Sequence, residues 1–172
     1  MSRLVHLQIE SSFAITHGYP TGAEIGYGLS EGWLSRRDAI EIALAKYKNE
    51  APLSPAEEEL ALLLSDEIQR VDDLVDELQD SDESVECRAR YWLYLALFWI
   101  WENRSEYADP LRVIEMLWAD FEYPDEIRGL IGFMPPGDSE IPGVEGIELR
   151  WRRYLERVHA EYEERSSSWR KN

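Results

Sequence analysis

Apolar side chains recur through most of the chain at the three- and four-residue spacing that places them on one face of an α-helix. The clearest example lies between residues 60 and 78, where the stripe consists of Leu60, Leu64, Ile68, Val71, Val75 and Leu78. Ser65 lies inside this stretch and can divide the helix in two. Comparable stripes predict helices over residues 36–48, 110–121 and 147–165.

Residues 84–102 predict a helix of a different kind, because it is apolar on nearly all sides between Tyr91 and Trp101. A helix without a polar face is expected at the centre of a bundle, with other helices around it. This apolar run has 11 residues, about half of the ~20 that a membrane-spanning helix needs. It is therefore predicted to form the core of the fold and not to cross a membrane.

Several of these helices are preceded by residues that typically begin one. The capping residues, with the proline that follows where there is one, are Thr21, Ser35, Ser54 with Pro55, and Asp109 with Pro110. Thr21 predicts a short helix through Leu29, and Pro124 predicts another that ends near Gly132.

Together these elements predict an all-α fold. We expect one domain over residues 1–165, a bundle of six or seven helices around the central helix at about 84–102. Residues 166–172 are expected to form a frayed tail. Three prolines and three glycines predict a surface loop over residues 134–146, and alternating apolar and polar residues allow a short strand from Leu4 to Ile9.

Charge is distributed unevenly along the chain. Eighteen Lys and Arg against 35 Asp and Glu give a formal net charge of −17, which disfavours nucleic acids and anionic membranes as partners. Residues 50–86 hold 14 of the acids and a single base, Arg70. This stretch is either a solubilising face or a docking surface for a basic partner. The candidate partner-binding residues are Asp66, Asp72, Asp73, Asp76, Glu77, Asp80, Asp82 and Glu83.

The start of the last long helix carries the opposite charge, with four arginines and one glutamate over Arg150–Arg157. Basic and aromatic residues together can bind nucleic acid. In so acidic a chain we expect these arginines to pair instead with its own acidic helix.

The residues that usually hold metals are scattered. The three histidines lie in separate segments, and Glu156 with His159 forms one copy of the Glu-x-x-His pair, whereas a di-iron site needs two. The acids of residues 72–83 lack the ligand spacing of a calcium loop. We therefore expect no metal and no cofactor.

Motifs for phosphate binding or nucleophilic catalysis are equally weak. The spacing of Gly22, Gly26 and Gly28 fits no phosphate-binding loop, and it favours turns and close helix packing instead. Cys87 stands beside Glu86 and is expected to be buried or half-buried and a poor nucleophile. A single cysteine and an N-terminus without a signal peptide favour the cytoplasm.

Two blocks of the chain, residues 26–47 and 92–136, contain motifs that together are similar to a known family. The motif residues are Gly28, Gly32 and Trp33, then Asp109-Pro110, Asp120-Phe121, Tyr123-Pro124 and Phe133-Met134-Pro135. These blocks resemble the bacterial family called domain of unknown function 2247. The family usually has a tyrosine where this chain has Phe133, and the acidic middle and the arginine-rich last helix fall outside the resemblance.

The resemblance implies a fold and not a reaction, since the family has no established enzyme activity. Small acidic helical proteins of this kind are similar in character to the immunity proteins of bacterial polymorphic or contact-dependent toxin systems. Our hypothesis is an immunity protein whose acidic surface covers a basic toxin domain, such as a nuclease. The alternatives are a small metal-dependent hydrolase on a helical bundle, which bound metal would reveal, and an acidic regulatory or structural interaction protein.

Overall fold

The computed structural model describes residues 3–138 and 140–169, and within them the chain forms helices and no strand. The first half contains α1 (Ser11–His17), α2 (Gly22–Glu31), α3 (Arg36–Lys48), α4 (Pro55–Ala61), the 3-10 helix η1 (Ser65–Arg70) and α5 (Val71–Leu78). The second half contains α6 (Val85–Glu102), η2 (Arg104–Glu106), α7 (Pro110–Asp120), η3 (Asp125–Leu130), α8 (Gly143–Glu163) and α9 (Ser166–Trp169). The all-α fold expected from the sequence is confirmed.

The helices begin where their capping residues predict. The Thr21 and Ser54 hydroxyls accept hydrogen bonds from the third residue of α2 and α4, and in each case that residue is a glutamate that closes a capping box. Ser35, Ser84 and Asp109 cap α3, α6 and α7 in the simpler one-bond form. These bonds are local, which is why the sequence reveals them.

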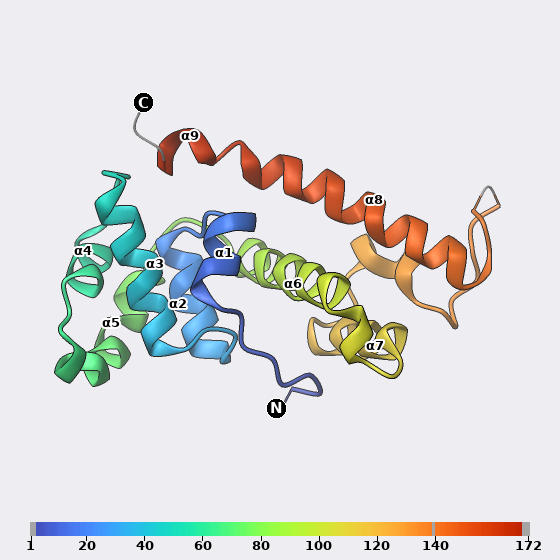
Figure 1. The fold of residues 1–172 in the computed structure, drawn as a ribbon, viewed down its shortest axis with the longest axis horizontal. Helices are drawn as coiled ribbons and strands as arrows, with labels where there is room; N and C mark the ends of the chain where they lie inside the picture. The colour runs from blue at the N-terminus through green and yellow to red at the C-terminus, as the bar shows by residue number, and fades with distance from the viewer. Residues whose placement is uncertain (1–2, 139, 170–172) are drawn as a thin grey trace.

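Helix α6 lies along the middle of the molecule, as its all-round apolar sequence predicts. Figure 1 shows α1 to α5 gathered at one end, α7 and η3 at the other, and the long helix α8 running beside α6 between the two groups. Trp92, Leu95 and Ile100 of α6 are fully buried. No helix in the described part of the chain is both long enough and apolar enough to span a membrane.

Glycine allows α2 to approach α6 closely. A Cβ added at Gly28 would lie 2.3 Å from the Trp92 ring, and the Trp92 indole N–H donates to the Glu24 carbonyl at 2.7 Å. Gly32 ends α2 in the left-handed conformation, with φ of 80°. The glycines therefore serve packing and turns, as the sequence predicts.

The N-terminal segment differs from expectation. Residues 5–10 have no regular secondary structure, so the strand suggested for Leu4–Ile9 is absent. Val5 and Ile9 are buried, but the Ile9 N–H donates to the Trp33 carbonyl at 2.8 Å and the Leu4 and Val5 N–H groups donate to the Asp120 carboxylate. The alternation of apolar and polar residues therefore reflects the burial of one side of an extended segment that has no partner strand.

Two other regions are more divided or more ordered than expected. The apolar stripe over residues 60–78 does not form one helix. Helix α4 ends at Ala61, and the 3-10 helix η1 begins at Ser65 and leads into α5. At the other end of the chain, residues 166–169 form α9 and Trp169 is buried, where a frayed tail was expected. Residues 170–172 of that tail lie outside the described residues.

Candidate functional site

The eight acidic residues predicted to bind a partner lie on η1, on α5 and in the loop that joins α5 to α6. Six of them, Asp66, Asp73, Asp76, Glu77, Asp80 and Asp82, are exposed, and none of the six forms an ion pair with any residue that the structure describes. We call these six side chains the acidic surface. The structure thus brings together most of the set that the sequence suggested.

The other two members are engaged within the fold. Asp72 accepts two hydrogen bonds from Arg36, at 2.9 and 2.7 Å, and the bond to Arg36 lowers the pKa of Asp72. Glu83 accepts a hydrogen bond from the Thr21 hydroxyl at 2.8 Å. Both carboxylates hold parts of the chain together, and they are less available to a partner than the acidic surface.

Helix α5 presents three of the six carboxylates of the acidic surface. Val71, Leu74 and Leu78 are buried on the face that packs toward α2 and α4. The carboxylates of Asp73, Asp76 and Glu77 lie on the remaining, exposed face. A partner would meet these charges on a packed helix and would not need to order a loop.

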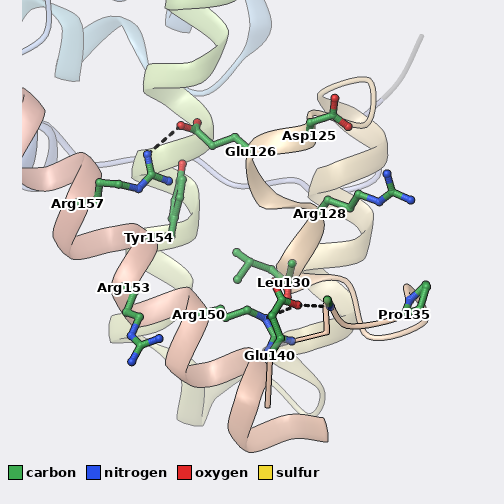
Figure 2. Close-up of a pocket in the computed structure, with 12 residues that line it drawn as sticks. Asp125, Glu126, Arg128, Leu130, Pro135, Glu140, Arg150, Arg153, Tyr154 and Arg157 are labelled. Atoms are coloured by element: carbon green, nitrogen blue, oxygen red, sulfur yellow. Dashed lines mark hydrogen bonds and ion pairs between the residues drawn. The ribbon is translucent and has the colours of Figure 1, made fainter. Parts of the chain in front are cut away.

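A second charged region lies at the opposite end of the molecule, between η3 and the first half of α8. Figure 2 shows this groove of about 570 Å³, which we call the arginine groove. Its charged lining residues are Asp125, Glu126, Arg128, Glu140, Arg150, Arg153 and Arg157. The groove joins residues 125–140 to the arginines of α8, a combination that the sequence analysis did not identify.

Two of these arginines are fixed by the walls of the groove. Arg150 donates to the carbonyls of Gly129 and Ile141, both at 2.7 Å. Arg157 lies 3.4 Å from Glu126, which also accepts a bidentate pair of bonds from Arg90. The expected pairing with the acidic helix is therefore wrong, since α8 and the acidic surface lie on different parts of the molecule.

The pKa of Glu126 reflects this pairing. Burial raises the pKa, but the hydrogen bonds and charges of Arg90 and Arg157 outweigh burial and hold it below its usual value. Glu126 is therefore ionised at neutral pH and neutralises the arginines beside it.

Arg128 and Arg153 are different, because neither guanidinium has a hydrogen bond or ion pair with the part of the chain that the structure describes. Tyr154 also lines the groove, and its ring lies beside Arg157 (Figure 2). The Tyr154 hydroxyl is buried without a hydrogen-bond partner among the described residues. Burial raises the pKa of this tyrosine, so its hydroxyl stays protonated and remains a donor.

In the described residues no three His, Cys, Asp or Glu side chains gather as a metal site. His159 lies 3.8 Å from Glu163, and Glu156 instead lies 3.9 Å from Arg152.

Cys87 is exposed in the first turn of α6, which corrects the expectation that it is buried or half-buried. The first turn of α6 extends beyond the core that surrounds the rest of that helix.

The loop expected over residues 134–146 is shorter than predicted, because α8 begins at Gly143, and residue 139 lies outside the described residues. Pro124 precedes η3, a 3-10 helix and not an α-helix.

The family motif residues build local structure: Asp109 caps α7, and the Trp118 indole N–H donates to the Pro124 carbonyl at 3.1 Å. Phe133 is 67% exposed.

Comparison with known proteins gives one result. Neither the curated proteins nor the solved structures contain a match to this chain. The model of a family described as an uncharacterized protein conserved in bacteria matches residues 13–159. This range covers α2 to η3 and most of α8, including the acidic surface and the arginine groove. The chain therefore belongs to the bacterial domain of unknown function 2247 family.

Proposed function

We propose that this protein is a non-enzymatic, cytoplasmic binding protein whose acidic surface docks a basic partner. In its specific form, the proposal is that the partner is a bacterial toxin domain and that this chain is the immunity protein that neutralises it. The observation that supports the proposal is the acidic surface, where six exposed carboxylates have no ion-pair partner among the described residues.

Such a cluster has a physical cost in the free protein. Asp76 and Glu77 follow Asp73 by three and four residues along α5, so both carboxylates are neighbours of Asp73 on the helix surface and repel it. A cationic partner removes this repulsion on binding. It is also attracted over a Debye length of about 8 Å at physiological salt, which speeds association.

The occluding mechanism needs no chemistry from this chain. A nuclease active site is lined with Lys and Arg that hold the phosphates of its substrate. Carboxylates of the acidic surface could take the place of those phosphates and block the site. Because α5 is packed through Val71, Leu74 and Leu78, covering the three carboxylates on α5 requires little further ordering of the backbone.

The test begins with capture of the partner from a lysate of the source bacterium at low salt. The captured protein is then purified, and its association with the wild type is followed by stopped-flow fluorescence over a range of salt. We expect the variant D73K/D76K/E77K to associate about tenfold more slowly at low salt and to show a flatter salt dependence.

The matched control reverses three exposed carboxylates of α8 and its end, as E145K/E148K/E164K, so that the net charge changes equally. An association rate that both variants reduce by the same factor would mean that net charge matters and the acidic surface does not. For the immunity function, the purified partner must also lose its toxic activity when bound. A basic partner that binds the acidic surface and keeps its activity would support docking and reject immunity.

A further inference from the structure

Two of the three histidines meet in the fold, although they lie far apart in the sequence. His17 ends α1 and His159 lies on α8, and their ring centroids are 6.3 Å apart. Helix α1 packs against both α6 and α8 (Figure 1). The contact between the histidines therefore belongs to a junction of three helices that only the tertiary structure assembles.

Aromatic side chains enclose the His17 ring, which is half-buried. The ring stacks on Phe98 of α6 with the centroids 4.3 Å apart, and it meets Phe13 of α1 at 4.4 Å. It has no hydrogen bond or ion pair with the described residues. Burial lowers the pKa of His17 and the charge of His159 lowers it further, against a smaller effect of Glu102. The neutral ring is therefore the form that this site accommodates.

Tyr94 of α6 connects the two histidines. Its hydroxyl donates to the His17 carbonyl at 2.8 Å and lies 3.1 Å from His159 Nδ1. A phenol has one hydrogen, and the His17 carbonyl accepts it, so His159 Nδ1 supplies the hydrogen of the second bond. The other ring nitrogen, Nε2, lies 3.8 Å from the Glu163 carboxylate. His159 can therefore accept a proton at Nε2 and keep its bond to Tyr94.

The two rings differ in how they can carry a positive charge. A protonated His159 pairs with Glu163, whereas a protonated His17 has no acceptor for its ring N–H groups among the described residues. It also faces a second cation whose ring centroid is 6.3 Å away. Repulsion between two partly buried charges is stronger than in bulk water. Double protonation therefore opposes the contact between α1 and α8.

The remaining charged groups around α1 do not relieve this conflict. Glu102 of α6 favours the charged form of His17, but burial and the second histidine outweigh it. On α3, Asp38 and Glu41 accept hydrogen bonds from Ser11, at the opposite end of α1. These two carboxylates hold the start of α1, and the histidine junction holds its end.

We propose that His17, Tyr94 and His159 form a pH-sensitive latch, which mild acid opens so that the end of α1 separates from α6 and α8. The start of α1 stays attached to α3, and opening uncovers the half-buried rings of Phe13 and Phe98. This histidine latch goes beyond the proposed docking of a basic partner, because it uses none of the residues of the acidic surface.

The direction of the response follows from linkage. The pKa of His17 in the fold lies below the ordinary value of 6.5, so the open segment binds more protons than the closed one just below that pH. Opening of the latch therefore becomes easier as the pH falls through this window. Glu24, with a pKa raised to about 7, has the opposite effect on global stability. Local opening of α1 and global unfolding should thus respond to acid in opposite directions.

The experiment follows the full chain by NMR from about pH 8 to about pH 5. The histidine ring signals report protonation, and amide hydrogen exchange of residues 14–19, corrected for the intrinsic pH dependence, reports opening of the latch. We expect His17 to titrate below pH 6.5 and the opening equilibrium to rise about threefold or more across this range.

Three variants separate the latch from other effects of acid. H17F keeps an aromatic ring against Phe98 and cannot be protonated, so opening should no longer depend on pH. H159Q keeps an N–H donor for Tyr94 and removes the second charge, so the pKa of His17 should rise and the pH response should shrink. H6Q is the matched control, because His6 is exposed and lies outside the junction, and it should respond as the wild type does.

The proposal is overturned if His17 titrates at or above pH 6.5, or if H159Q leaves that titration unchanged. It is also overturned if residues 14–19 exchange only through global unfolding, as measured in urea, or if H17F keeps the wild-type response. Loss of the response in H6Q would assign the effect to general charge and would equally reject the latch.

Discussion

At the scale of single residues, Glu24 connects the two ends of the sequence. Its carboxylate is fully buried and accepts hydrogen bonds from both terminal nitrogens of Arg165, at 2.6 and 3.1 Å. Glu24 also closes the capping box at the start of α2. One carboxylate thus joins α2 to the end of α8, which positions α8 along the bundle.

Glu24 should make stability depend on pH. Burial raises its pKa from 4.5 to about 7, although Arg165 acts in the other direction. The folded chain therefore binds more protons than the unfolded chain between these values, so the contribution of Glu24 to stability falls as pH rises through this window. We expect the wild type to lose about 3 kcal/mol relative to E24Q between pH 4.5 and 7. Urea denaturation at several pH values measures the difference.

The control for this prediction is E126Q, because the pKa of Glu126 is lowered and not raised. Its contribution is present above the unfolded pKa and is lost as pH falls through the folded value, which is the opposite sign. Parallel stability profiles for the wild type and E24Q would show that Glu24 is ionised with an ordinary pKa.

At the scale of elements, α9 covers a buried ion pair. Lys46 of α3 and Glu57 of α4 are both buried and pair with each other. The Trp169 ring lies 5.3 Å from the Lys46 ammonium and meets the Tyr19 ring edge to face at 5.6 Å. This four-residue helix therefore has a structural role, because it places the buried Trp169 ring against Lys46 and Tyr19.

Removing the Trp169 ring should therefore be costly. We expect W169A to lower the free energy of unfolding by about 3 kcal/mol, as for other buried tryptophans, and to speed amide exchange in α3 and α4. Urea denaturation and hydrogen exchange provide the two measurements. F133A removes an aromatic ring that is 67% exposed and should cost less than about 1 kcal/mol. Equal losses in the two variants would mean that α9 is not anchored by Trp169.

At the scale of the whole molecule, charge is separated along the long axis. The acidic surface lies with α5 at one end and the arginine groove with η3 at the other, while α6 and α8 connect them (Figure 1). Repulsion is concentrated where like charges crowd on one helix, and it opposes folding. The acidic surface and the arginine groove thus lie at opposite ends of the molecule.

Salt should stabilise this protein by screening that repulsion. We expect a rise from about 0.02 to 0.2 M NaCl to add roughly 1 kcal/mol, or about 3 °C in Tm. Thermal unfolding of D73N/D76N/E77N should show a smaller gain than E145Q/E148Q/E164Q, which removes the same charge elsewhere. A gain of equal size in both variants would assign the repulsion to net charge and not to the acidic surface.

The sequence by itself determined the features that depend on near neighbours. The start of α3 and the extent of α6 follow from a cap, a periodicity or an apolar run, each of which acts within a few residues. The acidic surface was predictable in part, because three of its six carboxylates lie on the exposed face of one short amphipathic helix. Backbone hydrogen bonding in a helix is local, so local sequence is enough to reveal it.

Only the tertiary structure decided which distant groups meet. Arg157 pairs with Glu126, 31 residues away, and Arg165 pairs with Glu24, 141 residues away. Trp169 becomes buried only because Tyr19 and Lys46 are brought beneath it. Composition predicted that the arginines of α8 would find acids, but not which ones, and it could not show that Arg128 and Arg153 would be left without any among the described residues. Charge and burial at such positions depend on the packing of whole helices, which no local pattern encodes.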